Sequence, residues 1–161
     1  MGERECSIQR RSQKIIEECP SPAISEEERE KICDLTIEAF KKVGYKSLGT
    51  VEYLYSNGEF YFIEMNTRLQ VEHTITEEVY NLDIVKEQIF IASGEKISIN
   101  QNDVKKMCHS IECRINAENP ITSLPSTGMV TTYHPPGGPG IRVDSLLYSG
   151  CSVTAFYDGL V

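Results

Sequence analysis

Polar side chains occupy every second position between Glu64 and Glu72, where the sequence reads EMNTRLQVE. Successive side chains of an extended chain point to opposite faces, so these even-numbered residues would share one face of a strand. The carboxylate of Glu64 and the amide of Asn66 offer hard oxygen ligands of the kind that Mg²⁺ takes beside substrate phosphates. The segment therefore predicts a metal-binding face, although the alternation also fits a half-buried strand whose outer face is only solvated.

A second carboxylate, Glu52, lies on the strand predicted to pair with this segment across a hairpin. A two-residue Asn57-Gly58 loop would send Glu52 and Glu64 to opposite faces, because one residue of register changes the face of every side chain. A three-residue loop over residues 56–58 would instead pair Tyr55 with Glu59 and bring both carboxylates to one face through a bulge. We predict the three-residue loop.

The predicted metal ligands are thus Glu52, Glu64 and Asn66, and the groups that follow them suit a small anion. The guanidinium of Arg68 offers a planar pair of donors. Glu72 is close enough in sequence to accept a proton from an anion that Arg68 holds. The alternatives are a pair of unrelated surface acids in place of the metal ligands, and an exposed Arg68–Glu72 ion pair worth less than about 1 kcal/mol.

Helices and strands with recognisable sequence signals must position these residues. Ser25 and Glu28 form a capping box at the start of an amphipathic helix, and Gly44 supplies its left-handed end. A second helix is predicted from Asp83 to Ser93. Strand patterns cover residues 5–10, 50–56, 59–66 and 107–117. This order predicts an α+β fold with a mainly antiparallel sheet.

Charge and composition narrow the class of protein. The chain of 161 residues has a formal charge of −8 and is 40% hydrophobic. An acidic chain argues against a nucleic-acid partner, which calls for clustered Lys and Arg. A charged start and the lack of an 18-residue apolar run argue against a signal peptide and a membrane span, so we expect a cytoplasmic protein. The six cysteines are predicted to be reduced, mostly buried thiols.

Several motifs closely resemble those of biotin carboxylases. They are ERECSIQRR (3–11), NGEFYFI (57–63), EMNTRLQVEH (64–73), IECRINAE (111–118), LPSTG (124–128) and PPGGPGIRVDS (135–145). The match runs along essentially the whole chain. The resemblance implies part of an ATP-grasp fold, with residues 1–106 as the carboxyl-terminal half of its catalytic region and residues 107–161 as the beginning of the biotin carboxylase carboxyl-terminal subdomain.

The resemblance also implies a reaction. The three predicted metal ligands would hold Mg²⁺ or Mn²⁺ ions that bridge ATP phosphates. Arg68 would orient bicarbonate with the help of Lys14 and the backbone of Val71, and Glu72 would take its proton. Bicarbonate would then attack the terminal phosphate to give carboxyphosphate. Arg114 would stabilise the charge on the biotin ureido oxygen, although an ion pair with a neighbouring glutamate is its simpler role.

Other positions match cofactor-binding positions of the family. By resemblance they are Gln9, Ser12, Lys14, Leu54, Ile63, Gln70 and Val71. Ser12 stands where several relatives carry His or Asn and offers a shorter hydroxyl in their place. Leu54 and Ile63 resemble an apolar shelf for adenine. Ordinary strand packing is the alternative for Gln9, Leu54 and Ile63, and a solvated basic patch is the alternative for Lys14.

The expected function is ATP-dependent carboxylation of biotin, a ligase reaction of the kind that feeds fatty acid biosynthesis. The implied partners are ATP, bicarbonate, a biotin carboxyl carrier protein or domain, a carboxyltransferase and a second copy in a dimer. The family's glycine-rich lid over ATP has no counterpart in this sequence, so we expect the chain to be inactive alone. The carboxyl-terminal part of the family's last subdomain is also missing after Asp158, which should expose apolar faces and make the chain poorly stable or self-associating. The alternatives are a non-catalytic remnant or interaction module, and another ATP-grasp ligase.

Overall fold

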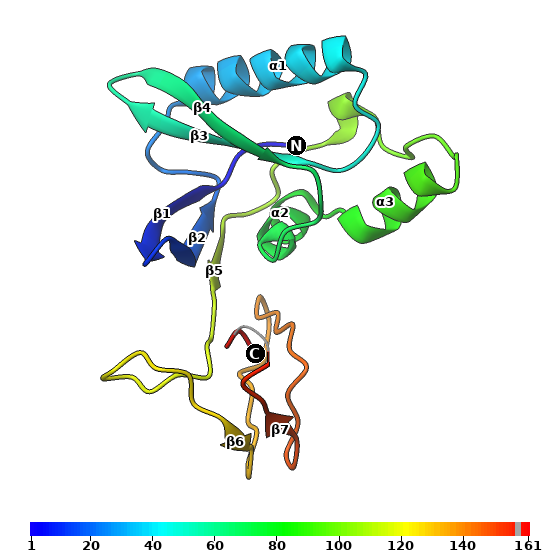
Figure 1. Cartoon of the computed structure of the whole chain (residues 1–161). Coiled ribbons are helices and arrows are strands. Elements are labelled where there is room, and N and C mark those ends of the chain that lie inside the picture. Colours follow the sequence, from blue (N-terminus) through cyan, green and yellow to red (C-terminus); the bar gives the residue numbers. More distant parts are fainter. Residues whose placement is uncertain (157–158) are drawn as a thin grey trace. The chain divides into compact units, whose positions relative to one another are not determined.

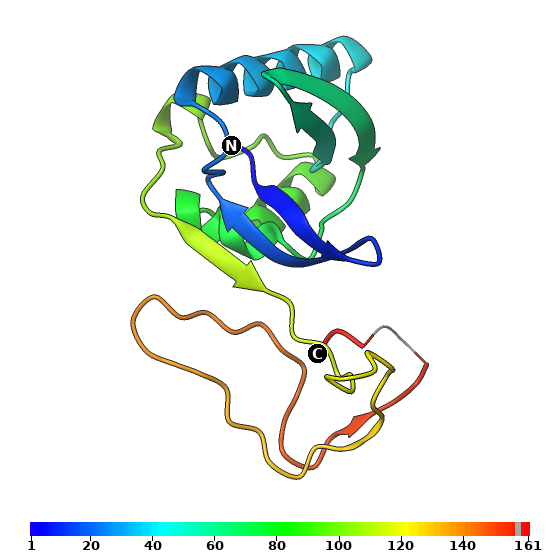
Figure 2. The same ribbon diagram turned by 90° about the vertical axis from the view of Figure 1, so that its left-hand side faces the viewer.

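The chain folds into two units, Met1–Cys113 and Arg114–Val161, in a computed structural model that describes residues 1–156 and 159–161. The first unit contains β1 (Glu5–Arg10), β2 (Gln13–Cys19), α1 (Glu26–Val43), β3 (Thr50–Ser56), β4 (Glu59–Asn66), α2 (His73–Tyr80), α3 (Ile84–Ala92), a 3-10 turn η1 (Gln101–Asp103) and β5 (Ser110–Cys113). Its strands form an antiparallel sheet in the order β1-β2-β5 and a separate β3-β4 hairpin (Figures 1 and 2). The predicted α+β fold with antiparallel strands is confirmed.

Helix α1 covers one face of the β3-β4 hairpin (Figure 1). The predicted capping box of Ser25 and Glu28 is present, and Gly44 ends the helix with a φ of 70°. Two hydroxyl contacts join helix to hairpin: Tyr55 donates to Glu28 at 2.7 Å, and the hydroxyls of Tyr53 and Thr36 lie 2.8 Å apart. Because alternate side chains of β3 face α1, the residues between them point to the opposite face, where the acidic side chains lie.

The hairpin turn differs from the prediction. Ser56 pairs with Glu59 across a two-residue loop in which Asn57 and Gly58 both have positive φ, 52° and 81°. This is the turn geometry that Asn-Gly favours, so the predicted three-residue loop and its Tyr55–Glu59 pair are wrong. The two carboxylates nonetheless share a face, because a bulge farther along the hairpin restores their register.

The bulge lies in β4 at Ile63. Tyr53 pairs with Phe62, whereas Glu52 pairs with Glu64, so Ile63 is one extra residue on its strand. Without it Glu52 would stand opposite Ile63, and Glu64 would point to the other face. The residue that corrects the register therefore directly precedes a predicted metal ligand.

The expected extended face from Glu64 to Glu72 is only partly formed. Strand β4 ends at Asn66, a loop follows, and α2 begins at His73 directly after Glu72. The period of two therefore stops at Asn66, and Arg68 and Glu72 reach their places by loop geometry. The strand expected over residues 107–117 is also shorter and covers only Ser110–Cys113.

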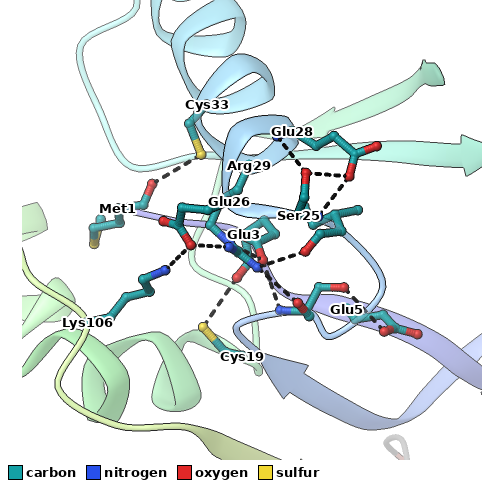
Figure 3. A network of polar contacts seen from close by, with 12 residues as sticks. Met1, Glu3, Glu5, Cys19, Ser25, Glu26, Glu28, Arg29, Cys33 and Lys106 are labelled. Carbon is teal, nitrogen blue, oxygen red and sulfur yellow. Dashed lines mark hydrogen bonds and ion pairs between the residues drawn. The ribbon is translucent and has the colours of Figure 1, made fainter. Parts of the chain in front are cut away.

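A network of polar contacts joins the start of the chain to α1 (Figure 3). The buried guanidinium of Arg29 donates through Nε to both carboxylate oxygens of Glu3, at 2.8 and 2.7 Å, and through Nη2 to the carbonyl of Ser21 at 3.0 Å. Its Nη1 contacts Glu26, which also pairs with Lys106. Beneath this network lies a small core of Cys19, Ile75, Val79 and Tyr80, with Leu82 and Val104 packed against it.

The second unit has little regular structure. Its two short strands, β6 (Gly128–Met129) and β7 (Ser152–Val153), pair antiparallel. Two isolated bridges, Asn116 with Leu160 and Glu118 with Pro125, connect its remaining segments. Many of its large apolar side chains are exposed, among them Ile121 at 90%.

All six cysteines are free thiols, but only Cys19 and Cys151 are buried, so the expectation of mostly buried thiols is wrong. Among the helices of the described residues, none has the length and apolar character needed to cross a membrane.

Candidate functional site

The three predicted metal ligands converge on the face of the hairpin opposite α1. Asn66 donates through Nδ2 to Oε1 of Glu52 at 3.1 Å and to Oε1 of Glu64 at 3.0 Å. Glu52 comes from β3, whereas Glu64 and Asn66 come from the end of β4. The pairing of Glu52 with Glu64, set by the bulge at Ile63, is what allows one amide to reach both carboxylates.

Lys14 on β2 links this hairpin face to the start of α2. Its Nζ donates to Glu52 Oε1 at 2.6 Å and to Glu72 Oε1 at 2.8 Å. Burial lowers the pKa of Lys14, but the hydrogen bonds to Glu52 and Glu72 outweigh that cost and leave the pKa above its ordinary value. One ammonium group therefore lies between a predicted metal ligand and the predicted proton acceptor.

Glu72 is almost fully buried, with 2% of its surface exposed. Burial raises its pKa, yet the hydrogen bond from Lys14 and the nearby charges of Lys14 and Arg4 lower it by more, so the net pKa lies below the ordinary value. The carboxylate is thus ionised at neutral pH. An ionised, buried carboxylate can accept a proton from a bound anion.

The segment between β4 and α2 carries the remaining anion-binding candidates. Gln70 is buried and donates through Nε2 to Glu52 at 3.2 Å. Arg68 is exposed; its Nη1 donates to the carbonyl of Leu69 at 3.2 Å, and its Nη2 lies 3.5 Å from Asn66 Oδ1. Val71 is also exposed. Arg68 therefore stands at the solvent edge of the site while Gln70 and Glu72 lie behind it.

Four of the cofactor-binding predictions fall on exposed positions outside these hydrogen bonds. Gln9 lies on β1, where its side-chain amide donates to the carbonyl of Cys6, and Ser12 lies in the β1-β2 turn with a φ of 65°. Leu54 and Ile63 are 59% and 56% exposed on the hairpin. Their roles stay predictions, as does that of Arg114, which is the first residue of the second unit.

Sequence reasoning missed Arg4, which lies directly before β1. Its guanidinium contacts two side chains of the site, donating to Gln70 Oε1 at 3.1 Å and lying 3.9 Å from Glu72 Oε1. The family-like segment ERECSIQRR includes this residue, but its spacing from the acidic segment gives no sign that the two meet.

The donor set suits a cation that phosphates help to bind. Within residues 1–156 and 159–161, no group of three or more His, Cys, Asp or Glu residues is arranged to hold a metal ion by itself. Two carboxylates and an amide are nevertheless the kind of partial set that Mg²⁺ takes, because it completes its shell with water and substrate phosphate. The residues present therefore fit a nucleotide-bound magnesium ion.

Comparison with known proteins identifies both units. Residues 1–100 match the family model of the carbamoyl-phosphate synthase L chain ATP binding domain, and residues 112–161 match that of the biotin carboxylase C-terminal domain. The whole chain is 56% identical to a biotin carboxylase of Pseudomonas aeruginosa and 52% identical to a pyruvate carboxylase subunit from Methanothermobacter thermautotrophicus. It spans 36% and 33% of these relatives, about a third of their length.

Solved structures agree with the sequence matches. The biotin carboxylase domain dimer of Hydrogenobacter thermophilus 2-oxoglutarate carboxylase, in complex with MgADP, ADP and bicarbonate, superposes with a TM-score of 0.95. It is 49% identical, and the match covers 99% of this chain and 36% of that one. The biotin carboxylase subunit of pyruvate carboxylase superposes with a TM-score of 0.94 at 47% identity. This chain therefore belongs to the biotin carboxylase family of ATP-grasp proteins.

Proposed function

We propose that this chain provides the metal-binding and bicarbonate-binding residues of a biotin carboxylase, which carboxylates biotin with ATP and bicarbonate through carboxyphosphate. The observation that carries the proposal is the position of Lys14, whose ammonium bridges Glu52 and Glu72 at 2.6 and 2.8 Å. This contact connects a metal-binding carboxylate to a proton-accepting one. A reaction that joins metal-bound phosphate to an anion needs these two groups side by side.

Glu52, Glu64 and Asn66 would hold the divalent cation. The bound cation would supply positive charge that offsets the negative charge of the ATP phosphates. At present the amide nitrogen of Asn66 faces both carboxylates, so the side chain must present its oxygen instead when it takes part in binding. Lys14 correspondingly gives up its contact with Glu52 and keeps the one with Glu72.

The anion-binding residues would act next. Arg68, Lys14 and the backbone N–H of Val71 bind bicarbonate and hold its hydroxyl towards Glu72. Glu72, ionised because its pKa is lowered, accepts the proton. A bicarbonate oxygen then attacks the terminal phosphate of ATP, the bond from that phosphate to ADP breaks, and carboxyphosphate forms. Gln70 supports this arrangement through its contact with Glu52.

Biotin would be carboxylated afterwards. Carboxyphosphate would break down to carbon dioxide and phosphate, and the released phosphate would take the proton of the biotin N–H. The nitrogen would then attack carbon dioxide while Arg114 stabilises the negative charge on the ureido oxygen. We propose residues 1–106 as the carboxyl-terminal half of the ATP-grasp region and residues 107–161 as the start of the carboxyl-terminal subdomain. The family-model matches over 1–100 and 112–161 support this division.

The wider setting is proposed from the relatives. A Hydrogenobacter thermophilus relative was solved as a dimer with MgADP and bicarbonate, which supports the same ligands and a dimer for this protein. We also propose a biotin carrier protein or domain as the source of biotin, a carboxyltransferase as the next enzyme, and a cytoplasmic location. The relatives are biotin carboxylases and pyruvate carboxylases, so they lend no support to another ATP-grasp ligase.

A cation titration tests the metal assignment. Mn²⁺ binding in the presence of ADP is followed by electron paramagnetic resonance for the wild-type chain, for Glu64→Gln and for Glu59→Gln. Glu59 is a matched control because it is an exposed glutamate on the same strand, at the hairpin tip. We expect Glu64→Gln to weaken binding at least about tenfold, or ~1.4 kcal/mol, and Glu59→Gln to leave it unchanged. Equal affinities for the wild type and Glu64→Gln would remove the metal assignment, and no binding by the wild type would favour a non-catalytic remnant.

A further inference from the structure

Arg4 joins four segments of the first unit at one guanidinium group. Its side chain is only 14% exposed. It reaches Thr76 Oγ1 on α2 at 2.8 Å, Gln70 Oε1 at 3.1 Å, Thr50 Oγ1 on β3 at 3.5 Å, Glu17 Oε2 on β2 at 3.8 Å and Glu72 Oε1 at 3.9 Å. Two of these partners belong to the proposed anion site. The other three are anchors on regular elements.

We propose that Arg4 is a positioning residue that holds residues 70–72 in the geometry that binds and deprotonates bicarbonate. This role rests on the proposed function, which assigns bicarbonate binding to residues 70–72. Arg4 does not touch the substrate in this scheme. It acts through Gln70 and Glu72, which are 6% and 2% exposed and lie between Arg4 and the ligand-binding face.

The contact with Gln70 fixes more than one side chain. The side-chain oxygen of Gln70 accepts from Arg4 while its side-chain nitrogen donates to Glu52. Its backbone carbonyl accepts from the backbone N–H of His73 at 3.2 Å, and the His73 ring nitrogen Nδ1 lies 2.9 Å from the same oxygen. Since both ends of Gln70 are held, the peptide that follows it is also held. That peptide carries the N–H of Val71, one of the proposed bicarbonate donors.

The contact with Glu72 concerns charge. Arg4 lies between two almost completely buried carboxylates, Glu17 at 1% exposure and Glu72 at 2%. Buried carboxylates repel each other unless a cation compensates them. Arg4 supplies such a cation 3.9 Å from Oε1 of Glu72, and Lys14 supplies a second one 2.8 Å from the same oxygen. Two cations therefore compensate the charge of Glu72, and each has a different second carboxylate: Glu17 for Arg4 and Glu52 for Lys14.

Four variants separate positioning from simple stabilisation. Arg4→Gln removes both the positive charge and the planar guanidinium group. Arg4→Lys keeps the charge but not the guanidinium, and Thr76→Val removes one hydrogen-bond acceptor of that group. Arg29→Gln is the matched control, because the side chain of Arg29 is 9% exposed, against 14% for Arg4, and its ion-pair partners are Glu3 and Glu26 rather than residues of the anion site.

Two signals are measured by nuclear magnetic resonance. The first is the side-chain amide of Gln70, whose two protons are expected to be well dispersed in the wild type and to collapse to exchange-averaged positions in Arg4→Gln. The second is the shift of the Val71 backbone N–H on titration with bicarbonate in the presence of MgADP. We expect Arg4→Gln to weaken bicarbonate at least about tenfold, with Arg4→Lys and Thr76→Val between it and the wild type. Mn²⁺ affinity should change less than about threefold in all four variants.

Comparison of Arg29→Gln with Arg4→Gln separates a positioning role from a general loss of stability. Arg29→Gln should lower the stability of the chain yet leave the Gln70 amide and the bicarbonate titration unchanged. The proposal is overturned if Arg4→Gln keeps the wild-type Gln70 signal and bicarbonate affinity, or if Arg29→Gln reproduces its effects. If Arg4→Gln does not fold, Thr76→Val carries the same comparison, and a wild-type response from it overturns the proposal. Failure of the proposed function looks different: the wild-type chain itself would show no bicarbonate response, while the Gln70 amide would still report on Arg4.

Discussion

Replacing Lys14 with methionine should destabilise the chain far more than the loss of a surface lysine would. The side chain of Lys14 is 14% exposed, and its two partners Glu52 and Glu72 are 21% and 3% exposed. Methionine fills a similar volume but cannot donate a hydrogen bond. The variant therefore leaves Glu72 buried with one fewer cation beside it.

The magnitude follows from the two contacts. Hydrogen bonds to charged groups are each worth roughly 1.5–3 kcal/mol, and removing one partner of a buried ion pair costs about 3–5 kcal/mol. Glu52 is partly exposed, so water can replace the hydrogen bond that it loses from Lys14. The lost contact with Glu52 should therefore contribute less to the destabilisation than the lost contact with Glu72. We expect Lys14→Met to lower the free energy of unfolding by about 2–4 kcal/mol.

Urea unfolding at pH 7 measures this loss, with Lys46→Met as the control at an exposed lysine. Adding Glu72→Gln to Lys14→Met removes the uncompensated charge and should restore about 1–2 kcal/mol. The penalty of Lys14→Met should also shrink as the pH falls below 4.5, the ordinary pKa of Glu72, because a protonated carboxyl needs no cation. The reasoning is refuted if Lys14→Met costs no more than Lys46→Met, or if the double variant is less stable than Lys14→Met.

Two further predictions concern stability. Arg29→Gln should lower the free energy of unfolding by about 3 kcal/mol, because it removes the two Nε contacts to Glu3 and leaves that carboxylate partly buried; urea unfolding checks this, and a loss below about 1 kcal/mol would contradict it. The lowered pKa of Glu72 contributes stability that is present above its ordinary value and is lost as the pH falls through the lowered one. Stability of the wild type should therefore fall more steeply between about pH 5 and pH 3 than that of Glu72→Gln, and parallel curves from acid titrations would count against this.

Elements with local signals were predictable from sequence. Helix α1 has its capping box at Ser25 and its left-handed end at Gly44, and both are set by residues within one turn of the helix ends. Strand β2 and helix α2 lack such signals. Glu17 in β2 is buried beside Arg4, which lies 13 positions earlier in the chain. The hydrophobic pattern of the sequence does not predict a buried glutamate. Helix α2 begins without a side-chain cap at Glu72.

The candidate site was predictable in its residues but not in its geometry. The types and spacing of Glu64 and Asn66 indicate oxygen ligands, and the structure places both beside Glu52. The predicted cause was a longer turn, whereas the register is set by the extra residue Ile63 in β4. Ile63 carries no local sequence signal for a bulge, such as a glycine, so the position of the bulge could not be predicted from the sequence. Arg4 was missed for the same reason, since its partners are distant in sequence.

Before any metal arrives, internal hydrogen-bond donors already occupy both acids: Lys14 and Asn66 donate to Glu52, and Asn66 also donates to Glu64. An incoming divalent ion must exchange with these internal donors, which lowers its net affinity. Exchange also releases Lys14 from Glu52 and leaves its full charge for an anion beside Glu72. By thermodynamic reciprocity, cation and anion should then strengthen each other's binding, so that neither is held firmly until both are present.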